Sequence, residues 1–377
     1  MAENTYAQDL ALLQGATDVI ELSNGDAAVI IAPAFQGRVM TTTLAGAAGA
    51  SFGWLNEEAI TGDQADPLFN NYGGEDRFWL GPEAGQFGLW FQAGEPFDLD
   101  HWKTPAGFND GAFTVLSNNG ESVAMETQFT VSNYSGATFE CGVKRTVTLL
   151  SSERVASLLE TDTAGLACVG FETANELTNA GTSPWTRDTG LLSIWILGQY
   201  KPLASGAVIA PFVPGDDADL GPAAMTDYFC ELPAERGRLV DDALLFTCDG
   251  ACRSKIGISP MRSKDVVGSY DPDSGVLTVV KFNLPVGAAE LPYVNSLWEM
   301  QDAPFAGDII NSYNDGEAEP GAGQLGPFYE IETSSPAAEA EPGESVSHIS
   351  ATMHLSGDRD KIFAVAKAVF GVDLAKI

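Results

Sequence analysis

The chain has 377 residues, 45% of them hydrophobic, which is enough to form one large core or two modest ones. Its 52 Asp and Glu outnumber its 19 Lys and Arg, giving a formal net charge of −33, so nucleic acid and anionic membrane surfaces are excluded as expected partners. No stretch approaches the roughly 18 to 20 apolar residues of a membrane helix, and we therefore expect a soluble protein.

The compartment and the oligomeric state stay open. The first residues, Met1 to Asn4, lack the basic and apolar regions of a signal peptide. They are equally consistent with a cytoplasmic protein and with a periplasmic or extracellular one whose signal peptide has been removed.

Helical periodicity occurs at the two ends of the chain. Near the start, Tyr6, Leu10 and Leu13 have the i, i+4, i+7 spacing of one helix face, which predicts a helix over about 4–15 between Asn4 and Gly15. Near the end, a second apolar stripe predicts a helix over about 358–371. Between them, 40 Gly and 20 Pro separate short runs of β-branched and aromatic residues, which is typical of strands.

The segment 70–83, NNYGGEDRFWLGPE, is the first that could carry chemistry. It combines three glycines, three carboxylates, an arginine and a tryptophan. Aromatic faces stack on the C–H patches of sugars, and amides, carboxylates and arginine bind the hydroxyls. The segment therefore offers Asn71, Tyr72, Arg77 and Trp79 as sugar ligands. The alternative is a glycine-rich turn before a core strand, with Arg77 paired to a carboxylate.

Two further segments follow. The loop-like sequence DLDHW places His101 beside Trp102, where a catalytic acid could reside. The segment 175–185, NELTNAGTSPW, offers Asn179 as a hydroxyl ligand and Trp185 as a stacking platform, whereas Trp195 lies in an apolar run and is expected in the core. The run 143–150 between these segments is rich in β-branched residues and predicts a strand.

The middle of the chain predicts no metal site. Five cysteines are odd in number and lack metal-knuckle spacing, although a bridge between Cys248 and Cys252 stays open. The acidic runs 216–219 and 271–273 lack the oxygen-ligand spacing of an EF-hand loop. We therefore expect no cofactor, with calcium as the alternative. The run 275–282 after the second acidic turn predicts another strand.

The last informative stretch holds two carboxylates on one predicted strand. Glu330 and Glu332 are two residues apart, which places both on one face, roughly 7 Å apart. If this face lines a cleft, one of the two carboxylates could act as a base whose pKa the other raises. If the face is exposed to solvent, the two are an ordinary solvated pair. Glu299 lies in the preceding segment 293–315 and is a further candidate site carboxylate. The run 317–326 reads as a long loop that could border such a site.

The segment 331–345, IETSSPAAEAEPGES, resembles the C-terminal signature of the galactose mutarotase-like superfamily, the aldose 1-epimerases and their relatives: a strand carrying Glu, then Pro, then a Pro-Gly-Glu turn. NNYGGEDR resembles the family's earlier His-Gly-Gly segment, and LTNAG its Asn-His segment. The segments 293–301, 307–316 and 324–336 look most like a bacterial subgroup of unassigned activity. The resemblance implies an all-β, mainly antiparallel β-supersandwich, one domain over 1–377, with a concave carbohydrate-binding face.

The resemblance also implies roles. Glu332 matches the glutamate base that takes the anomeric proton, whereas Tyr72 and the pair Asn179-Ala180 stand where the family has its histidines. Tyrosine is a weaker acid than imidazolium at neutral pH, so we do not expect acceleration of glucose or galactose anomerisation in the standard way.

Three functions therefore compete. The first is an epimerase-like enzyme acting on a sugar or uronic acid. The second is a sugar-binding protein without catalysis. The third is a hydrolase or lyase in which Glu330 or Glu299 works with Glu332.

Overall fold

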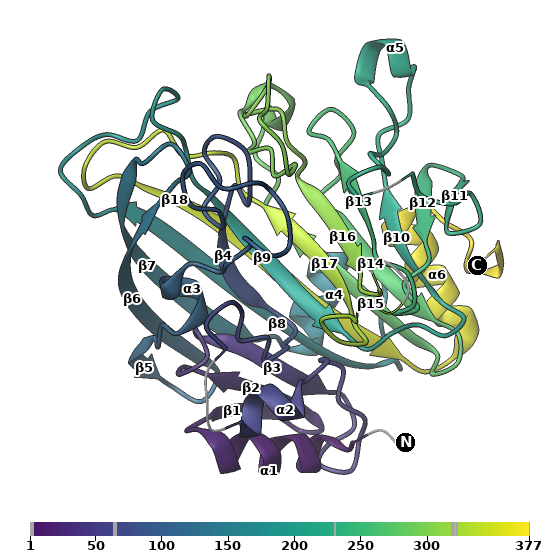
Figure 1. Ribbon diagram of the computed structural model, residues 1–377. Helices are drawn as coiled ribbons and strands as arrows, with labels where there is room; N and C mark the ends of the chain where they lie inside the picture. The colour runs from purple at the N-terminus through teal and green to yellow at the C-terminus, as the bar shows by residue number, and fades with distance from the viewer. Residues whose placement is uncertain (1–3, 63–65, 230, 318–320, 322, 377) are drawn as a thin grey trace.

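Three antiparallel sheets form the molecule (Figure 1), a computed structural model that describes residues 4–62, 66–229, 231–317, 321 and 323–376. The largest sheet has ten strands, in the spatial order β11 (Gly237–Val240), β12 (Ala243–Phe246), β10 (Ala207–Pro211), β14 (Val266–Asp271), β15 (Val276–Phe282), β18 (Ser345–Ser356), β8 (Ala167–Asn179), β7 (Thr138–Leu149), β6 (Ser122–Ser132) and β5 (Thr114–Asn118).

The other two sheets are smaller. One has five strands, in the order β13 (Ser254–Ile258), β16 (Ile310–Asn314), β17 (Tyr329–Ser334), β9 (Ser193–Tyr200) and β4 (Arg77–Gly81). The other consists of β1 (Ile20–Asn24), β2 (Ala27–Ala32) and β3 (Arg38–Thr43). This architecture confirms the predicted all-β, mainly antiparallel fold.

The helices are short apart from those at the two ends. They are α1 (Tyr6–Ala16), α2 (Glu57–Thr61), α3 (Ala106–Asn109), α4 (Ser152–Leu159), α5 (Asp217–Leu220) and α6 (Arg359–Phe370), with 3₁₀ turns η1 (Ala288–Glu290) and η2 (Leu374–Lys376). Figure 1 shows α1, α2 and the three-stranded sheet together at one end of the molecule.

Both predicted terminal helices are present, with small differences at their ends. The N-cap of α1 is Thr5 rather than Asn4, and the helix continues through Gly15 to Ala16. In α6, the side chain of Asp358 accepts hydrogen bonds from two backbone N–H groups, and Gly371 ends the helix with a φ of 77°. The helix α4 was not predicted, because its eight residues are too few to show a full apolar stripe.

The five-stranded sheet packs face to face against the ten-stranded sheet. The hydroxyl of Tyr329 lies 2.8 Å from Ser269 Oγ, and Thr333 Oγ1 lies 2.8 Å from the ring of His348. These contacts turn the odd-numbered residues of β17 toward the ten-stranded sheet. Because side chains alternate along a strand, Glu330 and Glu332 point to the opposite side.

The helix α6 covers the other face of the ten-stranded sheet. The apolar stripe of α6 packs in a core cluster with side chains of β10, β12, β14, β15 and β18. The stripe consists of Ile362, Val365, Ala366 and Phe370, all of them buried. The molecule therefore has a layered arrangement in which the outer face of the five-stranded sheet is left for the loops to cover.

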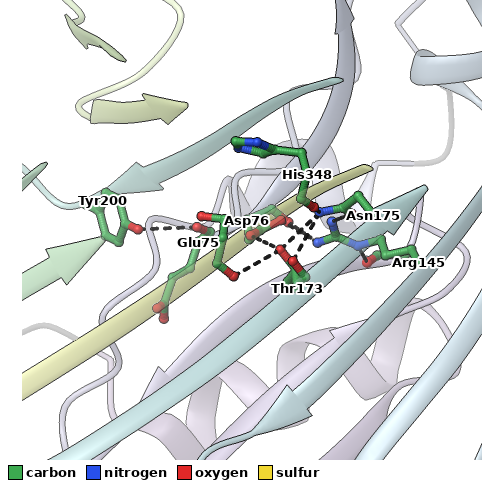
Figure 2. A network of polar contacts seen from close by, with 9 residues as sticks. Glu75, Asp76, Arg145, Thr173, Asn175, Tyr200 and His348 are labelled. Carbon is green, nitrogen blue, oxygen red and sulfur yellow. Dashed lines mark hydrogen bonds and ion pairs between the residues drawn. The ribbon is translucent and has the colours of Figure 1, made fainter. Parts of the chain in front are cut away.

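A buried polar network joins the sheets near the start of β4 (Figure 2). Asp76 pairs with Arg145 of β7, and Thr173 Oγ1 donates to Asp76 at 2.9 Å. The Arg145 guanidinium also donates to Asn175 Oδ1 at 2.6 Å. Beside it, Tyr200 donates its hydroxyl hydrogen to the carbonyl of Glu75 at 3.3 Å. A network satisfied in this way fixes the entry of β4 relative to the ten-stranded sheet.

Some sequence expectations concern loops and cysteines. The loop expected over 317–326 includes 318–320 and 322, which lie outside the described residues, as does Cys230. Four cysteines are free, so Cys248 and Cys252 form no bridge; the other two are Cys141 and Cys168.

Candidate functional site

A cavity of about 90 Å³ lies on the outer face of the five-stranded sheet and opens into a groove of about 880 Å³. Side chains of all five strands and of the covering loops form the cavity wall: Phe69, Arg77, Trp79, Glu83, Leu99, Trp102, Trp195, Leu197, Gln199, Phe229, Arg253, Lys255, Trp298, Tyr313, Leu325, Phe328 and Glu330. Six of these residues also line the groove: Phe69, Leu99, Trp102, Arg253, Tyr313 and Leu325. The cavity and the groove therefore form one continuous space.

The strand β4 brings Arg77 and Trp79 into the cavity. Before it, Gly73 and Gly74 have φ of 85° and 111°, and a Cβ on Gly73 would lie 2.1 Å from the carbonyl oxygen of Trp54. Only glycine fits such a close approach with positive φ. The turn therefore requires these glycines, and it places Arg77 in the site.

The Arg77 guanidinium pairs with Glu330 and covers a ring. Its Nη2 donates to Glu330 Oε1 at 2.7 Å, and its Cζ lies 3.9 Å from the centroid of Trp79. Both partners are almost fully buried. The predicted alternative, in which Arg77 pairs with a carboxylate, is therefore present, but inside a cavity wall rather than in a closed core.

Glu332 lies below the cavity wall. Lys255 Nζ and Trp195 Nε1 both donate to its Oε2 at 2.9 Å. Glu332 has no exposed surface, and its Oε1 has no hydrogen-bond partner within the described protein. The two carboxylates of β17 therefore differ: Glu330 contributes to the wall, whereas Glu332 lies beneath the wall and pairs with Lys255, which lines it.

Several polar atoms in the cavity wall have no partner within the described protein. They are Nε and Nη1 of Arg77, both side-chain amide atoms of Gln199, and the indole nitrogens of Trp79 and Trp298. A buried polar group without a hydrogen bond costs about 1 to 3 kcal/mol. Such a concentration beside aromatic rings is what a wall that binds a polar ligand requires.

Burial and neighbouring charges shift the pKa values of several ionisable groups in the wall. Burial and the charge of Glu332 raise the pKa of Glu330 to about 7, against the opposing effect of Arg77. Burial also raises the pKa of Glu83, which accepts a hydrogen bond of 2.7 Å from Trp102 Nε1. Burial disfavours the charged form of Lys255, but the neighbouring Glu332 raises the pKa of its ammonium group overall. Lys255 therefore stays charged.

The structure brings together part of the predicted residue set. Arg77, Trp79 and Glu330 line the cavity, and Glu332 lies directly beneath it. Asn71 lines the connected groove, where its amide donates to the carbonyl of Leu325 at 3.2 Å.

The other predicted residues lie outside the cavity lining. Tyr72 stacks on Phe35 at 4.1 Å beside the three-stranded sheet. The amide of Asn179 donates to two backbone carbonyls, those of Ser183 and Ala340. Three further predicted residues are absent from the lining. Trp185 is buried in the main core, and Glu299 is exposed. His101 pairs with Asp98 at 2.5 Å in an exposed loop.

Sequence reasoning missed Arg253, Lys255, Gln199, Glu83 and the aromatic residues of the covering loops. Cations are scarce in this chain, so the pair of cations in Arg253-Ser254-Lys255 was an available signal. Trp195, expected in the core, is buried but also lines the cavity.

The described residues contain no group of three or more His, Cys, Asp or Glu side chains placed to hold a metal ion. In the acidic runs considered for calcium, Asp216 caps α5 and Asp217 pairs with Arg262. Among the helices of the described chain, none is long and apolar enough to cross a membrane.

Solved structures with a similar fold include a galactose mutarotase-like protein from Lactobacillus casei ATCC 334, which is 11% identical with a TM-score of 0.51 over 90% of this chain and 100% of that one. The Slr1438 protein from Synechocystis sp. PCC 6803 is 12% identical with a TM-score of 0.53 over 90% and 96% of the two chains. A comparison with curated proteins finds no sequence that matches. These structures show that the fold is galactose mutarotase-like. Residues 4–377 match the model of the family described as "Family of unknown function (DUF6786)", and the chain therefore belongs to that family.

Proposed function

We propose that this protein binds a sugar in the cavity over β4, β9 and β17 and catalyses an epimerase-like reaction at its anomeric carbon. The observation that carries the proposal is the combination in one wall of indole and phenyl rings with unpartnered polar atoms of Arg77 and Gln199. Rings bind the C–H faces of a sugar, and the polar atoms bind its hydroxyls. The galactose mutarotase-like fold supports the same assignment by analogy.

We assign the base to Glu330 rather than to Glu332. Glu330 lines the cavity, and its pKa of about 7 suits a group that both takes and returns a proton near neutral pH. Both contacts of Glu332 go to a single carboxylate oxygen, and the residue has no exposed surface. Its role in the proposal is to hold Lys255 charged at the cavity wall.

Glu83 is the acid in this proposal. It lines the same cavity, and the raised pKa of its carboxyl group increases the protonated fraction. Glu330 takes the proton of the anomeric hydroxyl, Glu83 gives a proton to the ring oxygen, and the bond between that oxygen and the anomeric carbon breaks to leave an aldehyde. Closure on the other face reverses both transfers. Two carboxyl groups thus replace the Glu–His pair of the mutarotases.

A second candidate is sugar binding without turnover. The ion pair of 2.7 Å between Arg77 and Glu330 favours it, because a carboxylate held by a guanidinium is a weaker base.

The experiment compares Glu330→Gln with Glu332→Gln. Binding of neutral and acidic sugars is measured by calorimetry, and exchange between anomers by NMR. We expect Glu330→Gln to slow exchange by about 10²- to 10⁴-fold with little loss of binding, whereas Glu332→Gln lowers thermal stability because Lys255 loses its partner. Binding without any exchange supports the second candidate. Absence of binding by every sugar contradicts the proposal, and loss of exchange only in Glu332→Gln assigns the base to Glu332.

A further inference from the structure

Three cations line the cavity, and they differ in their partners. Arg77 pairs with Glu330, and Lys255 pairs with Glu332, so the two carboxylates of β17 neutralise these two charges. The third cation is Arg253, immediately before β13. It makes no ion pair with any residue that the structure describes. In a chain with 52 acidic and 19 basic residues, an unpaired arginine in a binding cavity is conspicuous.

Arg253 is held in place by aromatic rings rather than by a carboxylate. Its Cζ lies 3.9 Å from the ring centroid of Phe229 and 5.6 Å from that of Trp298. The nearby Asp315 is already bound, since Tyr313 donates to it at 2.7 Å and the N–H of Gly326 at 2.9 Å. The rings orient the planar guanidinium, which also lies within hydrogen-bond reach of the Tyr313 hydroxyl. Among the described residues, no carboxylate pairs with its fork of N–H donors.

The position of Arg253 fixes where an anionic group of a ligand would lie. Arg253 lines both the cavity and the groove, so its guanidinium stands at their junction. A planar fork of N–H donors matches the two oxygens of a carboxylate. The groove beyond it is lined by Glu58, Asp66 and Asp315, which repel further anionic groups.

We propose that the ligand is a sugar with a single carboxylate, a uronic acid unit, and that Arg253 binds this carboxylate at the junction of the cavity and the groove. The proposal rests on the sugar-binding function proposed above. It adds a specificity-determining residue and a substrate class: acidic sugars bind in preference to their neutral counterparts, and any further units that extend into the groove are neutral.

The test measures the affinities of matched pairs by calorimetry: glucose against glucuronate and galactose against galacturonate, with glucose 6-phosphate and trigalacturonate as further probes. A charge-assisted hydrogen bond contributes about 1.5 to 3 kcal/mol, so each uronate should bind at least about tenfold more tightly than its neutral sugar. Trigalacturonate should bind no more tightly than galacturonate, because the groove repels its other carboxylates.

Three variants test whether Arg253 causes the preference for uronates. Arg253→Gln should bring each uronate within about twofold of its neutral sugar, and Arg253→Lys, which keeps the charge, should retain part of the preference. Arg359→Gln is the matched control. Arg359 also lies over a phenylalanine ring, at 4.7 Å from Phe363, but on α6 behind the ten-stranded sheet, so its loss should change nothing. Melting temperatures identify any variant that fails to fold.

The outcomes separate the two proposals. If neutral sugars bind and their uronates bind no more tightly, the inference about Arg253 is wrong while sugar binding stands. The same holds if Arg253→Gln folds and keeps the full preference, or if glucose 6-phosphate binds more tightly than glucuronate. If no sugar of the panel binds, the proposed function itself is wrong.

Discussion

The charge state of Glu330 depends on its burial and on its charged neighbours Glu332, Arg77 and Lys255. Burial and Glu332 raise its pKa, and Arg77 and Lys255 lower it. Removing the cation in Arg77→Gln therefore raises the pKa of Glu330 above its wild-type value of about 7. Because the base acts in its deprotonated form, the rising limb of the pH–rate profile should move to higher pH in this variant.

The shift is measurable without turnover. Carbon-13 NMR of labelled glutamate follows the titration of the Glu330 carboxyl group directly in both proteins. A midpoint that stays the same or falls in Arg77→Gln would contradict the assigned electrostatics.

His348 makes a second residue-scale prediction, this time about stability. Burial between the sheets lowers the pKa of its imidazole to about 3, against an ordinary value of about 6.5. The unfolded chain therefore takes up a proton below about pH 6.5 while the folded protein does not, and stability is lost as the pH falls from there toward 3. The loss approaches about 1.4 kcal/mol per pH unit.

The variant His348→Gln lacks this titration and so separates it from the effects of other groups. We expect the difference in unfolding free energy, wild type minus variant, to decrease as the pH falls from 6.5 toward 3, in urea titrations monitored by fluorescence. A difference that is independent of pH would show that His348 is already protonated in the fold.

At the scale of the element, local patterns predicted much of the secondary structure. The strands expected over 143–150 and 275–282 correspond to β7 and β15, and both terminal helices lie within two residues of their expected ends. Alternation also placed Glu330 and Glu332 on one face, because strand geometry depends only on neighbouring residues.

The site itself required pairings that no local pattern contains. Lys255 reaches Glu332 only because β13 pairs with β16, and β16 with β17, across 77 residues of sequence. Asn179 and Trp185 satisfied the same chemical criteria as Arg77 and Trp79, yet Asn179 ends β8 of the ten-stranded sheet and Trp185 is buried in the main core. Residue type predicted the chemistry of the site, and long-range strand pairing decided which residues take part.

The glycine turn before β4 makes an element-scale prediction. Gly73→Ala introduces a Cβ that would lie 2.1 Å from the carbonyl oxygen of Trp54, at a φ of 85°. Strain of this kind and overpacking each cost about 1 to 3 kcal/mol, so the free energy of unfolding should fall by at least about 2 kcal/mol.

Gly25→Ala is the control for the Gly73 variant. Gly25 also has positive φ, 64°, but its Cβ would meet nothing within 4 Å. We expect about 1 kcal/mol for this backbone strain alone, measured by urea titration. Equal losses in the two variants would contradict the close approach to Trp54.

For the whole molecule, a net charge of −33 makes self-repulsion a measurable part of stability. Raising the salt concentration from about 0.01 M to about 0.1 M shortens the screening length from about 30 Å to about 10 Å. The urea midpoint should therefore rise with sodium chloride. Urea is the suitable denaturant because guanidinium chloride is itself a salt. A midpoint that falls would mean that favourable ion pairs outweigh the repulsion.

The three charged residues Glu75, Asp76 and Arg77 follow one another without a gap, yet they serve two sides of the sheet. Glu75 binds His354, Asp76 binds Arg145, and Arg77 enters the cavity. The spacing is thus as important as the residue types. Deleting Phe78 while Trp79 keeps its register would send the Arg77 guanidinium into the interior and the Asp76 carboxylate into the cavity. The length of this segment should therefore resist change even where surface loops vary freely.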